Sequence, residues 1–114
     1  VWKWILSDGE GKSKSMDYIK LNQQLWNNRT KTHYESNFYD VEGFLKGKES
    51  LNPPELALLG ELKGKKVLHL QCHFGQDTLA LARLGAEAVG VDFSEKGIET
   101  INACTLVMLG NGLY

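Results

Sequence analysis

The clearest pattern in this chain is a pair of short apolar runs separated by a segment rich in alanine and leucine. Residues 67–72 and residues 88–91 are apolar without clean alternation, as expected of parallel strands that helices cover on both faces. Residues 79–84 supply helix-forming side chains, and Gly85 follows where a C-terminal glycine cap belongs. Ser94 is a preferred N-cap for a second helix. The order strand, helix, strand, helix predicts an α/β unit with a right-handed crossover.

An amphipathic helix is predicted upstream of this unit. Met16, Ile19 and Trp26 fall near helical spacing within a polar stretch. Leu25 lies beside the last of these and widens the apolar stripe. We therefore expect a helix roughly over residues 17–28.

Two further segments precede the first strand. Residues 29–39 mix polar and aromatic side chains without either period, so we interpret them as a structured loop or an irregular helix over the site, with His33 exposed. Residues 52–55 (N-P-P-E) are a clear helix start, with an N-cap, a proline at the first helical position and an acid at the third. That helix ends by Gly60, and its leucines are expected to pack against the sheet.

The turn after the first strand and the end of the second strand carry the candidate chemistry. The run His73-Phe74-Gly75 must reverse the chain, and Gly75 can take a positive φ or let a ligand approach the backbone closely. Asp92 ends the second strand. A carboxylate at this place in a parallel sheet is where a ribose presents its two hydroxyls. The pattern therefore predicts the first half of a nucleoside-binding site.

These residues also resemble a known family. The run H-L-Q-C-H-F-G at residues 69–75, continued by Q-D-T-L and by G-V-D-F-S, resembles the first two motifs of the class I methyltransferases that use S-adenosylmethionine. His69 stands in the place of the acid of that motif. Gln71 and His73 stand in the place of its first two glycines, and Gly75 keeps the third. The run is similar to a variant form of the motif.

The resemblance, over about residues 64–101, implies a partial Rossmann-like fold preceded by N-terminal helices, with S-adenosylmethionine as the cofactor. It implies a flexible leader (1–15), an N-terminal helical lid segment (16–62) and a truncated cofactor-binding domain (63–114). No catalytic residue and no metal ligand is assigned. The cofactor-binding residues that it implies are Gln71, Cys72, His73, Gly75, Asp77, Asp92, Phe93 and Trp26.

The contacts implied for the turn have structural alternatives. Gln71, Cys72 and His73 are expected to offer mostly backbone contacts to the methionine end of the cofactor. Cys72 fits equally well as a small buried residue. His69 lies within the strand, and a core histidine with its hydrogen bonds satisfied is the favoured interpretation over a ligand contact.

The remaining contacts also stay open between two roles. Asp92 either binds the ribose hydroxyls through charge-assisted hydrogen bonds or serves as the N-cap acid of a helix or as an acid in a surface turn. Phe93 either packs on the adenine or belongs to the core. Asp77 either receives the methionine ammonium or favours the first turn of its helix through the helix dipole. Trp26 either faces the positively charged sulfonium or anchors its own helix.

Three functions follow from these patterns. The first is methyl transfer to an unidentified small-molecule acceptor, achieved mostly by proximity and in-line positioning. The second is a non-catalytic binding or interaction module that keeps the nucleoside half-site and self-associates through an open sheet edge. The third is a dinucleotide-binding remnant, which Gln71 and His73 disfavour because their side chains would crowd a pyrophosphate.

Composition sets outer limits on these interpretations. With 114 residues, 42% hydrophobic residues and a net charge of −1, the chain is predicted to form one soluble unit that does not bind nucleic acid. Cys72 and Cys104 lack metal or redox spacing, which favours the reducing cytoplasm. No stretch approaches the ~18 apolar residues of a membrane span. The strands are too few for the family's full sheet and the pattern changes after Ile101, so we interpret the chain as an N-terminal fragment whose last residues leave the parent fold.

Overall fold

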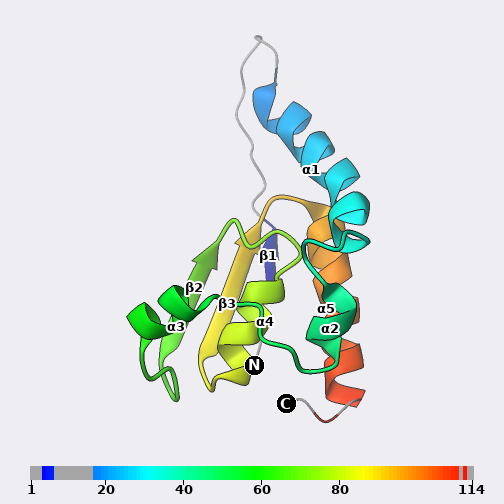
Figure 1. Ribbon diagram of the computed structural model, residues 1–114. Helices are drawn as coiled ribbons and strands as arrows, with labels where there is room; N and C mark the ends of the chain where they lie inside the picture. Colours follow the sequence, from blue (N-terminus) through cyan, green and yellow to red (C-terminus); the bar gives the residue numbers. More distant parts are fainter. Residues whose placement is uncertain (1–3, 7–16, 111, 113–114) are drawn as a thin grey trace.

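The structure is a computed structural model that describes residues 4–6, 17–110 and 112. Its elements are β1 (Trp4–Leu6), α1 (Tyr18–Tyr34), α2 (Val41–Leu45), α3 (Pro53–Leu59), β2 (Lys66–Leu70), α4 (Gln76–Arg83), β3 (Glu87–Asp92) and α5 (Glu95–Gly110). The predicted strand, helix, strand, helix unit is present as β2, α4, β3 and α5 (Figure 1). None of the helices described has the length and apolar character needed to cross a membrane. The predictions for Met16 and for the leader over residues 7–15 lie outside the described residues.

A parallel sheet of three strands carries the described fold, in the order β1-β3-β2. β2 pairs with one side of β3, with Leu70 opposite Val91, and β1 pairs with the other side, with Leu6 opposite Asp92. The assignment of residues 4–6 to a flexible leader is therefore wrong, because their backbone groups extend the ladder of β3. A small α/β unit with a parallel sheet is compatible with the predicted partial Rossmann-like fold.

The two faces of this sheet differ in burial. Ala88 and Asp92 of β3 are buried on the face over which α4 lies (Figure 1). On the opposite face, Leu68 and Leu70 of β2 are 60% and 63% exposed. The prediction of a strand buried on both faces is therefore wrong for β2. It is an edge strand with one open face, and its apolar pattern alone does not reveal which neighbours are present.

The main core lies where α2, α4 and α5 meet. Its buried members are Val41, Phe44, Phe74, Leu79, Ala80, Ile101, Cys104 and Met108. α5 continues to Gly110 although the side-chain pattern changes after Ile101. Cys104 and Met108 follow Ile101 at helical spacing and stay buried, so the change of pattern does not end the helix.

α1 is longer than predicted, and a different face of it makes the contacts. It begins at Asp17, whose side chain accepts the N–H of Lys20, and it runs through residues that were expected to be irregular. Ile19 and Leu25 remain 45% and 42% exposed, so of the described residues of the predicted apolar stripe only Trp26 is half-buried. A mostly polar set of side chains, spaced every three or four residues, forms the contact face of α1. These side chains bond to the end of the sheet or to α5, or are buried, and they are Gln23, Asn27, Thr30 and Tyr34.

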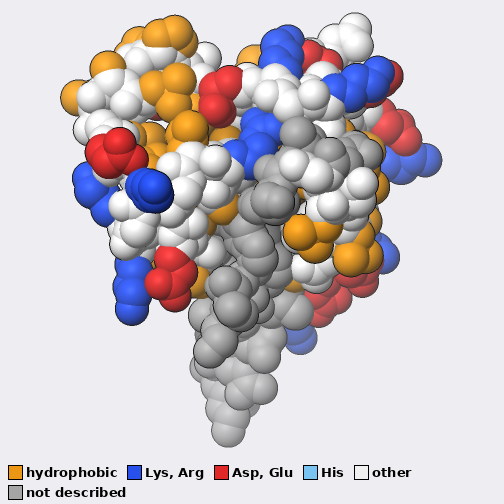
Figure 2. Space-filling view, turned by 90° about the horizontal axis from the view of Figure 1, so that it is seen from below, with side chains coloured by type: hydrophobic (Ala, Val, Ile, Leu, Met, Phe, Trp, Pro, Cys, Tyr) orange, Lys and Arg blue, Asp and Glu red, His pale blue; other side chains and the backbone are white. Residues whose placement is uncertain are grey.

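α3 has the predicted start but not the predicted packing. Glu55 accepts the backbone N–H of Asn52, and the helix ends at Gly60 with a positive φ of 62°. No residue of α3 is buried, and Leu58 is 90% exposed. Of the α3 residues, only Leu59 packs partly against a second, smaller hydrophobic cluster. The buried members of that cluster are Leu62, Leu81, Ala86 and Ala88. Hydrophobic side chains are gathered on the α3 and β2 side of the face in Figure 2.

The buried end of α5 yields a test of this packing. Replacing Met108 by Ala should lower the free energy of unfolding by about 2–4 kcal/mol, because a fully buried side chain leaves a cavity. The neighbouring change Leu109→Ala should cost less than about 1 kcal/mol, since Leu109 is exposed. Urea unfolding followed by circular dichroism measures both, and equal costs would contradict the packing of this helix end.

Candidate functional site

The turn between β2 and α4 holds three alternate residues in the left-handed backbone region. Gln71 and His73 each have φ of 55°, and Gly75 has φ of 68°. In the methyltransferase motif that residues 69–75 resemble, these three positions are glycines. For residues with a side chain this conformation costs roughly 1–2 kcal/mol, so surrounding contacts must hold it. The predicted reversal of the chain here, with a positive φ at Gly75, is confirmed.

Asp92 ends β3 beside this turn, and backbone N–H groups hold both of its carboxylate oxygens. Oδ2 accepts the N–H of His73 at 2.7 Å, and Oδ1 accepts the N–H of Ser94 at 2.8 Å. The residue is only 8% exposed. An ionised carboxylate offers about four lone-pair positions, so about two remain, one on each oxygen. The arrangement suits a ligand that presents two neighbouring hydroxyls.

A pocket of about 370 Å³ lies beside Asp92. Its volume is within the range of small-molecule sites. Gln23 of α1 donates to the carbonyl of Phe93 at 2.7 Å, and Asn27 accepts the hydroxyl of Ser94 at 2.7 Å, so α1 is held against the end of β3 as one wall. The residues that line the pocket are Asn22, Trp26, Gln71, His73, Asp92 and Phe93. Five of the eight predicted cofactor-binding residues therefore meet here.

The other three predicted residues, Cys72, Gly75 and Asp77, line a smaller pocket of about 150 Å³. It shares two residues of the turn with the larger pocket. The N–H of Cys72 donates to the carbonyl of Val91, and the N–H of Gly75 donates to the carbonyl of Cys72. The N–H of His73 is also engaged, so the backbone contacts predicted for Cys72 and His73 would have to come from their carbonyl groups, and they stay a prediction.

Cys72 and His69 have structural environments. Burial, followed by the charge of Asp92, raises the pKa of the Cys72 thiol to about 12. The thiol therefore stays protonated at neutral pH and is no nucleophile. His69 Nδ1 lies 2.8 Å from the hydroxyl of Thr78 on α4, so the side chain has the expected hydrogen-bond partner. It is half-buried and also lines the smaller pocket, so its placement in the core stays a prediction.

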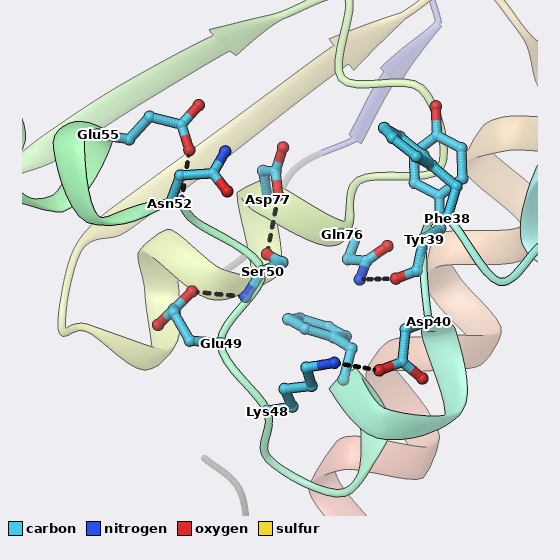
Figure 3. A pocket seen from close by; sticks show the side chains of 11 residues that line it. Phe38, Tyr39, Asp40, Lys48, Glu49, Ser50, Asn52, Glu55, Gln76 and Asp77 are labelled. Carbon is cyan, nitrogen blue, oxygen red and sulfur yellow. Dashed lines mark hydrogen bonds and ion pairs between the residues drawn. The ribbon is translucent and has the colours of Figure 1, made fainter.

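A third pocket, of about 370 Å³, lies next to Asp77 (Figure 3). Oδ1 of Asp77 accepts the hydroxyl of Ser50 at 2.8 Å, and Asp40 pairs with Lys48 at 2.5 Å. Glu49 and Glu55 accept backbone N–H groups, and the amide nitrogen of Gln76 donates to the carbonyl of Tyr39 at 2.8 Å while its oxygen is buried without a hydrogen-bond partner. The role of Asp77 toward a methionine ammonium stays a prediction. In the described part of the chain, no three His, Cys, Asp or Glu side chains gather as a metal site.

His33, which the sequence places in an exposed loop, lies at the centre of this end of the molecule. It is half-buried in the last turn of α1, with its Nδ1 3.0 Å from Nε2 of His73. Trp26 lies edge-on to both imidazoles, and Tyr39 stacks on His33 at 5.4 Å between ring centroids. The interpretation of His33 as an exposed loop residue is wrong. The spacing of seven between Trp26 and His33 places them on one helix face and could have indicated this contact.

Gly97 allows α5 to begin close to the turn. The hydroxyl of Ser94 accepts the N–H of Gly97 at 3.1 Å, which confirms the predicted N-cap. A Cβ at Gly97 would lie 2.8 Å from the carbonyl oxygen of His73. Glycine at this position therefore lets the backbone of α5 lie close to the backbone of His73, although glycine lowers the helix propensity.

Comparisons with known proteins add a partial similarity. No family model matches the chain, and no solved structure matches it. It is 37% identical over 68 residues to the ubiquinone biosynthesis O-methyltransferase of Proteus mirabilis, which covers 56% of this chain and 28% of that protein. It is 39% identical over 80 residues to an uncharacterized protein of Haemophilus influenzae, which covers 64% of this chain and 32% of that protein. The matches thus span at most about a third of these relatives. The first of them loosely supports a methyltransferase relationship.

The close approach at Gly97 is testable with a matched pair of substitutions. Gly97→Ala should lower the free energy of unfolding by at least about 1 kcal/mol, because the new methyl group meets backbone that cannot move freely. Gly110→Ala in the same helix meets nothing within 4 Å and should be neutral or stabilising. Thermal unfolding by circular dichroism compares them, and a stabilising Gly97→Ala would contradict this geometry.

Proposed function

We propose that this chain binds S-adenosylmethionine and forms the cofactor-binding part of a methyltransferase that acts on a small-molecule acceptor. The carboxylate of Asp92 carries the proposal. Each oxygen is held by one backbone N–H and keeps one position for a ligand, and the side chain lines a pocket of suitable volume. The two hydroxyls of a ribose would fill those positions with charge-assisted hydrogen bonds. The similarity to the Proteus mirabilis O-methyltransferase supports the class of reaction.

The turn favours a cofactor without phosphate. A dinucleotide site offers free backbone N–H groups and small residues to a pyrophosphate. Here the N–H of His73 is donated to Asp92, and Gln71 and His73 carry side chains that line the pocket. The Asp92 carboxylate itself would also repel a pyrophosphate placed against the turn. These features argue against the dinucleotide-binding alternative.

The remaining contacts of the proposed site follow from the pocket walls. When bound, S-adenosylmethionine supplies an electrophilic methyl group on a positively charged sulfonium. Phe93 lies beside Asp92, where an adenine would stack, and Trp26 closes the pocket from α1 with a ring that attracts cations. Arg29 already lies 5.4 Å from the centroid of the Trp26 ring, so a sulfonium would need another part of that ring. Catalysis would rest mostly on holding donor and acceptor in line.

The acceptor and the rest of the catalytic machinery are part of this proposal, and the matches span at most about a third of the relatives' length. We also propose a cytoplasmic setting. It is supported by Cys72 and Cys104, which are both free and buried.

A second candidate is an interaction module that self-associates through the open edge of β2. The observation that favours it is the exposure of Leu68 and Leu70, which lie beside each other on the uncovered face. An unpaired strand edge with apolar side chains is a template for pairing with another chain. A second copy pairing along β2 would continue the sheet.

Isothermal titration tests the cofactor assignment. Titration with S-adenosylmethionine should give a binding heat that saturates, whereas titration with NAD should give no binding heat. Asp92→Ala should weaken binding by about 10- to 100-fold, because the hydroxyls lose a charged acceptor. Heat with NAD and none with S-adenosylmethionine would overturn the assignment.

The control for this titration is Glu87→Gln, which alters an exposed carboxylate at the start of the same strand. Its affinity should match that of the unaltered chain. Because Asp92→Ala also leaves two backbone N–H groups without an acceptor, Asp92→Asn is measured beside it, and circular dichroism verifies that each variant is folded. A folded Asp92 variant with unchanged affinity would contradict the ribose role.

Sedimentation equilibrium tests the second candidate. If copies pair through β2, the chain should form a dimer or larger assembly that dissociates in Leu68→Lys, because a charge would then lie in the joined face. The matched change Leu106→Lys, on the exposed side of α5, should leave the assembly intact. A monomer at all concentrations would exclude self-association as the function.

A further inference from the structure

Two imidazoles join α1 to the turn after β2. His33 Nδ1 and His73 Nε2 lie 3.0 Å apart, which is a hydrogen-bond distance. Only one of the two nitrogens can donate, so the other must be unprotonated. The link therefore exists when at least one of the rings is neutral, and it fails when both carry a proton on these nitrogens.

The surroundings of the pair disfavour charge. His73 packs against the rings of Trp26, Tyr39 and Phe74, with centroid distances of 5.4, 5.9 and 4.5 Å. Its Nδ1 is buried without a hydrogen-bond partner. Burial, and then a charge on His33, lowers the pKa of His73, while Asp92 opposes this more weakly.

The other titratable and charged groups near the pair come from several elements. Arg29 of α1 lies over Trp26 and adds positive charge on that side. The Tyr39 hydroxyl stays protonated, because burial and the charge of Asp77 raise its pKa. The Cys72 thiol, 3.9 Å from the carbonyl of His73, is neutral as well. Among the described residues, Asp92 is the carboxylate bonded to His73, and it binds the backbone N–H.

The position of the backbone N–H of His73 depends on where the imidazole of the same residue is held. His73 has the strained φ of 55°, and its ring is wedged between His33 and the aromatic side chains. The backbone N–H of the same residue holds Oδ2 of Asp92 at 2.7 Å. A contact that holds the ring therefore also holds the carboxylate that faces the pocket.

We propose that His33 is a positioning residue, and that its bond to His73 is a proton-controlled latch that ties α1 to the turn and keeps Asp92 aligned. In the closed state one imidazole donates to the other, and α1 forms the wall of the pocket. In acid both rings are protonated, the two donors repel, and α1 moves away from the turn. The latch itself needs no ligand, while the consequence for nucleoside affinity rests on the proposed function.

The direction of the pH dependence follows from the lowered pKa of His73. A histidine whose pKa is lower in the folded state binds fewer protons there than in the unfolded chain. Its contribution to stability is therefore complete above about pH 6.5 and is lost as the pH falls through its folded value. Acid should open the latch, and neutral pH should close it.

The fluorescence of Trp26 should report whether the bond between His33 and His73 is formed, because the Trp26 ring contacts both histidines. The experiment uses the full chain with Trp2→Phe and Trp4→Phe, so that Trp26 is the remaining tryptophan. Between about pH 7.5 and about pH 4.5, a range that extends below the ordinary histidine pKa, its emission should move to longer wavelength as the indole becomes hydrated. An emission maximum that does not move over this range would overturn the latch.

Two histidine substitutions separate the latch from general acid effects. His33→Gln supplies an amide that bonds to either form of His73, so the emission change should disappear. His69→Gln alters a histidine that bonds to α4 instead of α1, so the change should persist. A wild-type emission profile in His33→Gln would overturn the proposal.

A measurement on the unsubstituted chain covers the case in which His33→Gln does not fold. Nitrogen-15 NMR at neutral pH should show a scalar coupling across the hydrogen bond between Nδ1 of His33 and Nε2 of His73, and acid should abolish it. A coupling that is absent at neutral pH, or that persists in acid, would overturn the latch without any variant.

Ligand titration then distinguishes this inference from the proposed function. Affinity for S-adenosylmethionine should fall about tenfold from about pH 7.5 to about pH 4.5 in the unsubstituted chain, and much less in His33→Gln. If the emission change occurs but S-adenosylmethionine never binds, the proposed function fails and the latch stands. If binding is strong and equally pH-independent in both chains, the positioning role fails and the proposed function stands.

Discussion

A nearly buried carboxylate that accepts two backbone N–H groups organises this molecule. Asp92 is 8% exposed, and its charge is tolerable there because His73 and Ser94 each donate to one of its oxygens. These bonds connect the turn after β2 to the start of α5. The positive φ of His73 and the glycine at position 97 both follow from bringing those two pieces of backbone together.

The part of the fold that could be predicted is the part in which local chemistry and tertiary packing agree. The strand, helix, strand, helix order, the positive φ of Gly75 and the cap at Ser94 follow from side chains whose preferences act over a few residues. Asp92 could be placed because the end of a parallel strand has a defined position in space. The two backbone N–H groups that donate to Asp92 could not be predicted, since their positions depend on how the turn and α5 approach each other.

The features that were missed depend on long-range neighbours. α1 packs through polar side chains such as Gln23 and Asn27, so its contact face has no hydrophobic period to detect. Residues 4–6 form β1 only because β3 offers an unpaired side. Leu68 and Leu70 look like buried strand residues, and they are exposed because their face of the sheet lacks a described covering element. His33 gains its importance from a partner 40 positions away.

The most direct test of the account is a crystal structure of the chain with S-adenosylhomocysteine, which has the same ribose and lacks the reactive methyl group. The account predicts that the two ribose hydroxyls lie within about 3 Å of Oδ1 and Oδ2 of Asp92, while His73 and Ser94 keep their bonds to the same oxygens. A ligand bound with its ribose away from Asp92, or a carboxylate turned from the pocket in the complex, would contradict it.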